Sequence, residues 1–344
     1  MAINEAELRD CPKPISYEST KKILDQMAKN ICKINIDGKR GTGFFTKIPI
    51  DDKLIPVFMT NYHVIDKEYL DSKNEIKVYL YNEESKIINI KNKVIYYNEE
   101  YDVVMVEIDE KKDGKYDYLA LDDNILKNDK IYDYIGKSIY IIQYPSYQEN
   151  QQLSVSYGII KNRFDDEEEY NFRHYCSTEY GSSGSPILNI YNNKIIGIHK
   201  QRHEKNNYNI GSFLYYSIKE YINKYKEKIN NKKKENDNKY DNECLKEFNK
   251  QYNLNIKDIN ITELDLNYKK IGNDGLKYLC ENINLKELKE LNLYDNNISD
   301  IKCLEKVEFA KLEILKLSGN KISNIDILEN VNFKELKELN LYHN

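Results

Sequence analysis

The chain has 344 residues, enough for two or three domains, and its 40% hydrophobic and 32% charged content is typical of a soluble globular protein. A formal net charge of −5 at pH 7 argues against a nucleic-acid or membrane partner. The six cysteines form no CxxC pair, the first residues lack an apolar run, and no stretch approaches the roughly 18 apolar residues of a membrane span, so we expect reduced thiols in a cytoplasmic protein.

The first predicted element is a helix over residues 16–31. Its apolar residues Ile23, Met27 and Ile31 recur at helical spacing, and Ser19 and Thr20 are candidate N-caps. Strands are then predicted at 32–36, 42–48, 55–60, 76–81, 86–96 and 103–108. After a connection at 110–137, further strands are predicted at 138–144, 153–160, 185–190, 194–199 and 212–216, before a closing helix at 217–229. We therefore expect an N-terminal helical segment at 1–30 and a β-rich domain at 31–229.

Three polar residues stand where apolar strands begin or end. His63 follows the apolar run 56–59, Asp102 opens the run 103–106, and Ser183 lies between two glycines just before the run 187–190. A serine hydroxyl needs an adjacent base to act as a nucleophile, and a carboxylate can orient that base. Taken singly, each residue has an ordinary interpretation: a packing histidine, a strand-capping aspartate and a turn serine.

Together the three motifs resemble those of the chymotrypsin-like (trypsin-fold) serine proteases, whose triad follows the chain order His, Asp, Ser. The matching segments are Thr60-Asn61-Tyr62-His63-Val64, Tyr101-Asp102-Val103-Val104 and Gly181-Ser182-Ser183-Gly184-Ser185-Pro186, and Gly41-Thr42-Gly43-Phe44-Phe45 matches the family's early strand. The resemblance covers about residues 30–225. Val64 stands where secreted relatives carry a half-cystine, and Ser182 stands where digestive relatives carry an aspartate. Both differences favour the bacterial glutamyl-endopeptidase-like and heat-shock-protease branches.

The resemblance implies a role for each of these residues. His63 would be the general base, Asp102 would fix its tautomer, and Ser183 would be the nucleophile. The backbone N–H groups of Gly181 and Ser183 would form the oxyanion hole. Ser182 would serve the packing of the loop. No cofactor is implied, and the acidic run 165–169 is more typical of a solvated loop than of a metal site.

Residues after and before the nucleophile bear on substrate choice. Relatives that cut after basic residues carry an aspartate where this chain has Ser177. Thr178, together with His199 in a Gly-x-His motif, resembles the pocket of glutamyl endopeptidases and picornavirus-type proteases, which receives Glu or Gln. Arg202 would then clamp an acidic side chain or partly plug the pocket. Alternatively, His199 packs between barrel and helix, as we expect His174 and His203 to pack elsewhere.

The hydrophobic pattern changes after residue 229. Residues 230–242 contain no aliphatic side chain and indicate a linker, or an exposed helix end, within a charged linker at 230–256. The pattern Leu288-x-x-Leu291-x-Leu293-x-x-Asn296 then recurs 24 residues later from Leu312 and again from Leu336. It resembles the leucine-rich repeat, so we assign 257–344 to such repeats, incomplete at the C-terminus. The leucines would face inward and the asparagines would bond to the backbone at each turn.

The predicted fold class is therefore multidomain: an all-β, chymotrypsin-like double β-barrel followed by an α/β leucine-rich-repeat solenoid. The predicted function is a serine endopeptidase that acts on protein substrates, with cleavage expected after Glu or Gln. The repeats would bind substrate or a regulatory protein through residues such as Lys289, Glu290, Asn292 and Tyr294, and their counterparts Lys337, Glu338, Asn340 and Tyr342. The alternative is a non-catalytic interaction protein built on a protease fold.

Overall fold

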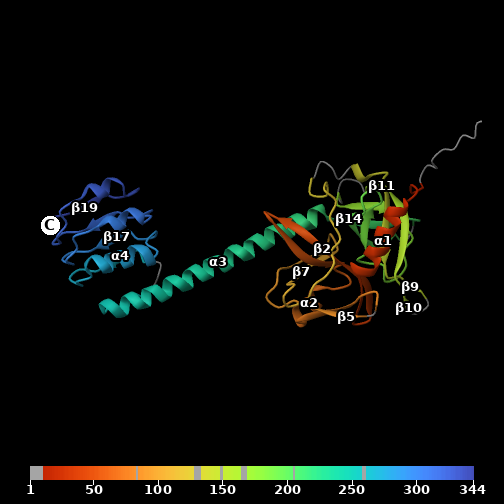
Figure 1. Ribbon diagram of the computed structural model, residues 1–344, viewed down its shortest axis with the longest axis horizontal. Coiled ribbons are helices and arrows are strands. Elements are labelled where there is room, and N and C mark those ends of the chain that lie inside the picture. Colours follow the sequence, from red (N-terminus) through yellow and green to blue (C-terminus); the bar gives the residue numbers. More distant parts are fainter. Residues whose placement is uncertain are drawn as a thin grey trace, which may run out of the picture. The chain divides into compact units, whose positions relative to one another are not determined.

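The computed structural model describes residues 11–82, 84–127, 133–147, 150–163, 169–203, 206–257 and 261–344. The chain divides into two compact units, with the boundary between Lys228 and Ile229. Figure 1 shows the elements of each unit, which we take in turn. In the described ranges all six cysteines are free thiols, and none of the helices there has the length and apolar character needed to cross a bilayer.

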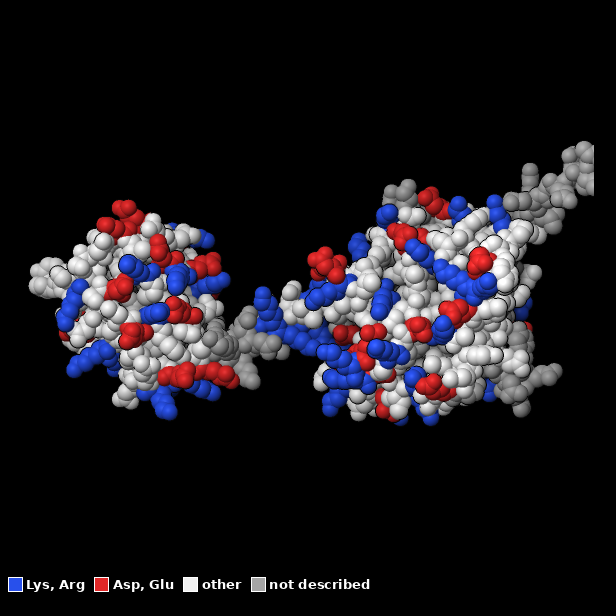
Figure 2. Space-filling model, viewed as in Figure 1, with Lys and Arg blue, Asp and Glu red and all other residues white. Residues whose placement is uncertain are grey.

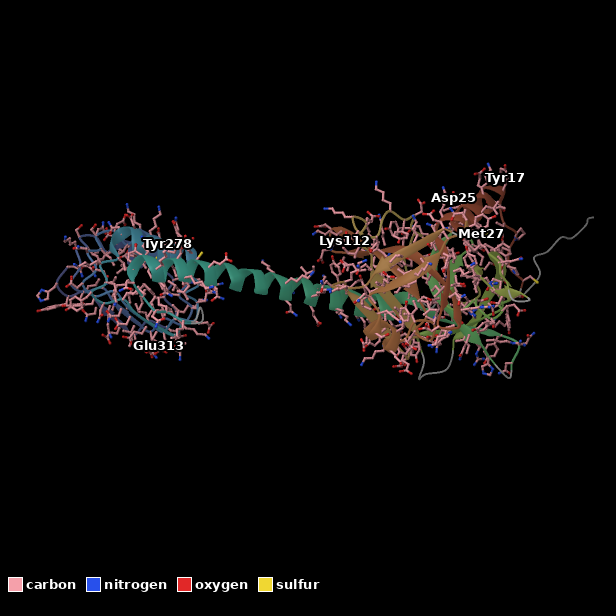
Figure 3. All side chains as sticks on the ribbon, turned by 90° about the horizontal axis from the view of Figure 1, so that it is seen from below. Tyr17, Asp25, Met27, Lys112, Tyr278 and Glu313 are labelled. Atoms are coloured by element: carbon pink, nitrogen blue, oxygen red, sulfur yellow. The ribbon has the colours of Figure 1, made fainter. Side chains whose placement is uncertain are left out.

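Helix α1 (Tyr17–Lys29) opens the first unit. Its N-cap is Ser16, which accepts the N–H of Ser19, rather than the predicted Ser19 and Thr20. Ile23 and Gln26 are its buried residues, and Gln26 Nε2 donates to Asn193 O at 2.9 Å. Figure 3 shows side chains of this helix, among them the labelled Tyr17, Asp25 and Met27. The helix is thereby packed onto the strands that follow Ser183 rather than left as an independent segment.

Seven antiparallel strands form the first sheet, in the order β5-β4-β1-β2-β3-β7-β6. They are β1 (Ile31–Ile36), β2 (Lys39–Ile50), β3 (Lys53–Thr60), β4 (Glu75–Tyr79), β5 (Ser85–Asn89), β6 (Ile95–Asn98) and β7 (Val103–Glu107), with the short helix α2 (Lys67–Ser72) after β3. The predicted strand 86–96 is in fact two strands, because Asn92 turns the chain with a φ of +63°. β5 and β6 each pair with one neighbour and form the two edges of the sheet. The strands predicted to form the first barrel are therefore hydrogen-bonded as an open sheet.

The second sheet closes into a barrel in the order β11-β12-β15-β14-β13-β8. Its strands are β8 (Ser138–Gln143), β11 (Ser154–Arg163), β12 (Asn171–His174), β13 (Pro186–Asn189), β14 (Lys194–Arg202) and β15 (Asn209–Phe213), with a small hairpin of β9 (Ser146–Tyr147) and β10 (Asn150–Gln151). β12 was not predicted. The last strand ends at Phe213, not at 216, because the apolar residues from Leu214 onward follow helical spacing and bury Leu214, Ile218 and Tyr221.

Helix α3 (Leu214–Tyr252) continues beyond residue 229, where the closing helix was predicted to end, and takes up most of the predicted linker at 230–256. The segment contains neither glycine nor proline, and its Lys, Glu and Asn residues are compatible with a solvated helix. Its first turns pack on the core of the first unit through Leu214 and Ile218. Leu245 and Phe248, near its end, belong to the core of the second unit. The low aliphatic content of residues 230–242 therefore belongs to a helix, which was the open alternative, and not to a linker.

The second unit is built on four parallel strands in the order β16-β17-β18-β19. They are β16 (Glu263–Asp265), β17 (Glu290–Asn292), β18 (Ile314–Lys316) and β19 (Glu338–Asn340), accompanied by α4 (Gly272–Asn282), η2 (Lys302–Lys306) and η3 (Asp326–Glu329). Leu264, Leu291, Leu315 and Leu339 stand opposite one another in register. Asn320 Nδ2 donates to Leu293 O at 2.8 Å and Leu317 O at 2.9 Å, so it joins neighbouring turns through the backbone.

Candidate active site

His63 lies in the turn that follows β3, where Thr60 and Asn61 end the apolar strand. β3 pairs with β7 so that Thr60 stands opposite Val104, which brings this turn beside the start of β7. Asn61 reinforces the contact, because its Nδ2 donates to the carbonyl oxygen of Asp102 at 2.7 Å. The register of the first sheet therefore places His63 next to Asp102.

Asp102 holds the His63 imidazole through its carboxylate. Its Oδ2 lies 2.8 Å from His63 Nδ1, and its Oδ1 accepts the backbone N–H of His63 at 3.0 Å. The Asp102 backbone has a φ of +54°, a left-handed conformation that aspartate tolerates better than most residues. Asp102 is buried, whereas 48% of the His63 side chain is exposed. Because the carboxylate accepts at Nδ1, neutral His63 carries its proton there and leaves Nε2 as an acceptor.

The loop that carries Ser183 is fixed against β2 and the end of β3. Gly184 has a φ of +86°, and a Cβ added to it would lie 2.2 Å from Thr42 O and 2.5 Å from Thr60 Oγ1, so only glycine fits. Ser183 O accepts the N–H of Thr42 at 2.8 Å. Thr42 Oγ1 donates to Gly181 O at 2.9 Å. These contacts hold the serine loop at the strand end from which the His63 turn departs.

The Ser183 hydroxyl donates to Lys200 O at 3.2 Å, and no hydrogen bond joins it to His63 in the described part of the structure. Both segments nevertheless pack against Gly41. A Cβ added to Gly41 would lie 3.3 Å from Ser183 O and 2.6 Å from Val64, the residue after His63. Catalytic hydrogen bonds are often long or misaligned without substrate. The hydroxyl must leave Lys200 O to reach the free Nε2 of His63.

Gly181 and Ser183 present the backbone N–H groups expected of an oxyanion hole. Within the described ranges neither N–H donates to an acceptor of the protein. Their neighbours are engaged: Ser182 N–H donates to Glu179 O at 3.0 Å, and Ser185 Oγ donates to Ser182 O at 2.6 Å. Gly181 reaches this geometry with a φ of +93°. Two unused donors beside a serine hydroxyl suit a developing oxyanion.

His199 is 2% exposed, and its ring contacts that of His174. His174 Nε2 lies 3.2 Å from His199 Nδ1, and the N–H of Cys176 donates to His174 Nδ1 at 3.3 Å. Because His174 Nδ1 is an acceptor, neutral His174 carries its proton on Nε2 and donates it to His199 Nδ1. Neutral His199 therefore carries its own proton on Nε2.

The protonation of both rings follows from their surroundings. Burial, and next the charge of His63, lower the pKa of His199 to about 3, against an opposing hydrogen-bond contact with the backbone of Ile210. Burial, and next His199, lower the pKa of His174 well below its ordinary value. Both rings are neutral at pH 7.

The other residues predicted to contact substrate lie on the same loop and strand. Ser177 is exposed, and its carbonyl oxygen accepts Gln143 Nε2 at 3.0 Å. Thr178 is half-buried. Arg202 is exposed at the end of β14, opposite Asn209.

The roles of two residues near the site were not predicted from the sequence. His174, which we expected to pack elsewhere, is the direct partner of His199. Phe172 and His174 are both fully buried on β12, a four-residue strand in which Asn171 is buried as well. Lys200, whose carbonyl oxygen accepts the Ser183 hydroxyl, gave no signal in the sequence.

The described residues contain no group of three or more His, Cys, Asp or Glu that could hold a metal ion. Of the acidic run 165–169 only Glu169 lies within those residues, so the prediction made for that loop concerns residues outside the described ranges.

Residues 41–198 match the family model of the trypsin-like peptidase domain. Similar solved structures include the serine endoprotease from Yersinia pestis, with a TM-score of 0.43 and 17% identity over 61% of this chain and 68% of that chain. They also include a Glu endopeptidase in complex with MPD, with a TM-score of 0.41 and 19% identity over 57% of this chain and 89% of that chain. No curated protein sequence matches the chain.

Proposed function

We propose that the chain is a serine endopeptidase that hydrolyses peptide bonds through His63, Asp102 and Ser183, because residues 41–198 match the trypsin-like peptidase domain. The observation that carries this proposal is the 2.8 Å contact between Asp102 Oδ2 and His63 Nδ1 beside the anchored Ser183 loop. That contact leaves His63 Nε2 to remove the Ser183 proton during attack and to return it to the leaving amine. The N–H groups of Gly181 and Ser183 stabilise the oxyanion.

We further propose that the enzyme cleaves after Gln, and less efficiently after Glu. His199 supports this choice because it is neutral and carries its proton on Nε2, as the contacts of His174 require. A neutral N–H donor pairs with the amide oxygen of Gln without leaving a buried charge. A Glu carboxylate would bring a charge that His199 does not neutralise. The backbone of Ile210 is the competing partner of this ring.

Peptides that differ only in the residue before the cleaved bond test this preference. With the full-length protein at pH 7.5, kcat/KM should be highest for Gln, about tenfold lower for Glu, and lower again for Leu and Lys. Each value is measured by the appearance of the new amino terminus. A profile led by small apolar residues would contradict the role given to His199 while leaving the triad intact. Repeating the series with Arg202→Ala shows whether Arg202 contributes to the Glu rate.

The second unit, we propose, is a leucine-rich-repeat array that recruits a substrate or a regulatory protein. Glu263, Asp265, Glu338 and Asn340 are exposed on its two edge strands, β16 and β19, and the residues at the matching positions of β17 and β18 are half-buried. Lys316 bonds to Glu290 at 2.5 Å and Lys337 to Glu313, labelled in Figure 3, at 2.6 Å, so adjacent repeats are linked by ion pairs. On the face that Figure 2 shows, both signs of charge are interspersed in this unit. Such a surface favours a polar protein partner over a polyanion.

Tyrosines at the strand ends offer the sharpest test of recruitment. Tyr268 is 60% exposed and Tyr342 is 71% exposed, and exposed aromatic residues are common binding anchors. The double variant Tyr268→Ser/Tyr342→Ser should cleave a ten-residue peptide at the wild-type rate. It should cut the most rapidly cleaved proteins of a cell extract about tenfold more slowly, because tethering raises the effective substrate concentration. Lys321→Ser/Asn330→Ser is the matched control. Equal loss on the peptide, or no loss on any protein, would contradict recruitment through this face.

A further inference from the structure

Lys200 interrupts the regular pairing of β14 with β15. His199 stands opposite Gly211 and Gln201 opposite Ile210, so Lys200 is the extra residue of a β-bulge. A bulge takes one residue out of the ladder and redirects its side chain, and such irregularities concentrate beside active sites. Here the bulged residue is the one whose carbonyl oxygen accepts the Ser183 hydroxyl at 3.2 Å.

The side chain of Lys200 crosses from the second barrel to the first sheet. Its Nζ donates to Glu100 O at 2.9 Å and to Asn171 Oδ1 at 3.3 Å, and lies 5.5 Å from the centre of the Tyr170 ring. Glu100 belongs to the turn that leads into Asp102. Lys200 therefore touches both sides of the triad: the Asp102 turn through its ammonium group and Ser183 through its backbone.

A second contact holds the same turn. Ser212 Oγ lies 3.1 Å from Tyr101 O and 2.9 Å from Asn171 Oδ1, so Asn171 joins the two contacts. The carbonyl oxygen of Glu100 thus accepts from Lys200, and that of Tyr101 lies within hydrogen-bonding distance of Ser212, both residues of the second barrel. The Tyr101 ring packs edge-on against Tyr170, with 4.8 Å between centroids. The turn that delivers Asp102 is consequently held by the barrel that delivers Ser183.

This clamp acts beside a residue with a left-handed backbone. Asp102 has a φ of +54°, which is uncommon for a non-glycine residue, and contacts with its surroundings help to maintain it. Rotation of the turn would move Oδ1 and Oδ2 away from the two His63 nitrogens that they bind. A displacement of about 1 Å at a catalytic group can cost roughly 100-fold in rate.

We propose that Lys200 is a positioning residue, which couples the Asp102 turn to the Ser183 loop across the two halves of the peptidase domain. The proposal rests on the triad proposed above. Lys200 does not touch substrate in this role; it acts through Asp102. Its removal should therefore lower kcat and leave KM nearly unchanged.

Lys200→Met tests the clamp, because methionine keeps the length of the stem and removes the ammonium donor. We expect kcat for a Gln peptide to fall 10- to 100-fold with KM within about twofold, and Lys200→Arg to recover part of the loss. The matched control is Lys194→Met on the same strand, whose Nζ pairs at the surface with Asp123 at 2.7 Å. Its kcat should equal that of the wild type.

A double-mutant cycle with Asp102→Asn separates positioning from general stability. If Lys200 acts through Asp102, Lys200→Met should have little further effect in the Asp102→Asn background. Full additivity, or wild-type kcat in Lys200→Met, would overturn the proposal. If Lys200→Met does not fold, Ser212→Ala, which removes the second contact with the turn, replaces it in the same cycle. An active Ser183→Ala would instead refute the triad itself, so the two failures are distinguishable.

Discussion

Ser183→Ala should lower kcat/KM for a cleaved peptide by about 10⁴- to 10⁶-fold, with substrate binding largely preserved. The methyl group of alanine cannot form the acyl-enzyme, and it leaves the loop in place because the anchoring contacts are made by the backbone. Ser183 O still accepts the Thr42 N–H, and Gly184 still packs on Thr60. His63→Ala should cost a similar factor, and the double variant should be no worse than either single one, because the residues act as a unit.

A fluorophosphonate probe, which labels an activated serine, tests the same site without the need for a known substrate. The wild-type protein should be labelled at Ser183, as mapped by mass spectrometry, and Ser183→Ala should not be labelled. Ser182→Ala is the discriminating control, because Ser182 is the adjacent hydroxyl and is buried, with its Oγ accepting the N–H of Glu179 at 3.1 Å. Labelling that survives Ser183→Ala and disappears in Ser182→Ala would move the nucleophile by one residue. Absence of labelling in the wild type would favour the non-catalytic scaffold.

The candidate site residues could be proposed from sequence because three motifs beside apolar runs, in the order His, Asp, Ser, together resemble those of a known family, whereas each residue singly has an ordinary interpretation. His63, Asp102 and Ser183 each adjoin such a run, and strand pairing then fixes their neighbours in space. Apolar runs did not predict the end of a strand correctly where that end depends on tertiary packing. Residues 212–216 are apolar enough for a strand, yet Leu214 begins a helix because Leu214, Ile218 and Tyr221 bury one helical face.

The contacts between residues around the site could not be predicted from the spacing of residues in the sequence. The partnership of His174 with His199 requires β12 and β14 to flank β15 in a closed barrel, and β12 is only four residues long. The contact of Lys200 with Glu100 depends on a bulge that alters the register by one residue. A bulge has no hydrophobic signature of its own, since the apolar pattern on either side of it continues. Composition likewise could not distinguish a solvated helix from a linker at 230–252.

His199→Phe should remove most of the preference for Gln. Phenylalanine retains a buried ring against His174 and lacks the Nε2 proton that we assign to substrate binding. A lost hydrogen bond that leaves the amide oxygen of Gln unpaired corresponds to about 100-fold in kcat/KM. The rate for a Leu peptide should change much less, because that side chain makes no such bond. His203→Phe, a histidine just beyond the end of β14, is the control and should keep the wild-type ratio.

The pH dependence of this preference follows from the direction of the shift. The pKa of His199 is lowered from 6.5 to about 3, so the ring stays neutral as the pH falls and gains a proton only in strong acid. The Gln-to-Leu ratio of kcat/KM should therefore be flat between about pH 5 and pH 9, even where each rate falls with protonation of the general base. A Glu peptide should differ, because its own carboxyl becomes neutral near pH ~4.3 and its relative rate should rise toward that value. A Gln-to-Leu ratio that bends near pH 6.5 would show that His199 titrates as an ordinary exposed histidine. The buried pair with His174 would then be the wrong basis for specificity.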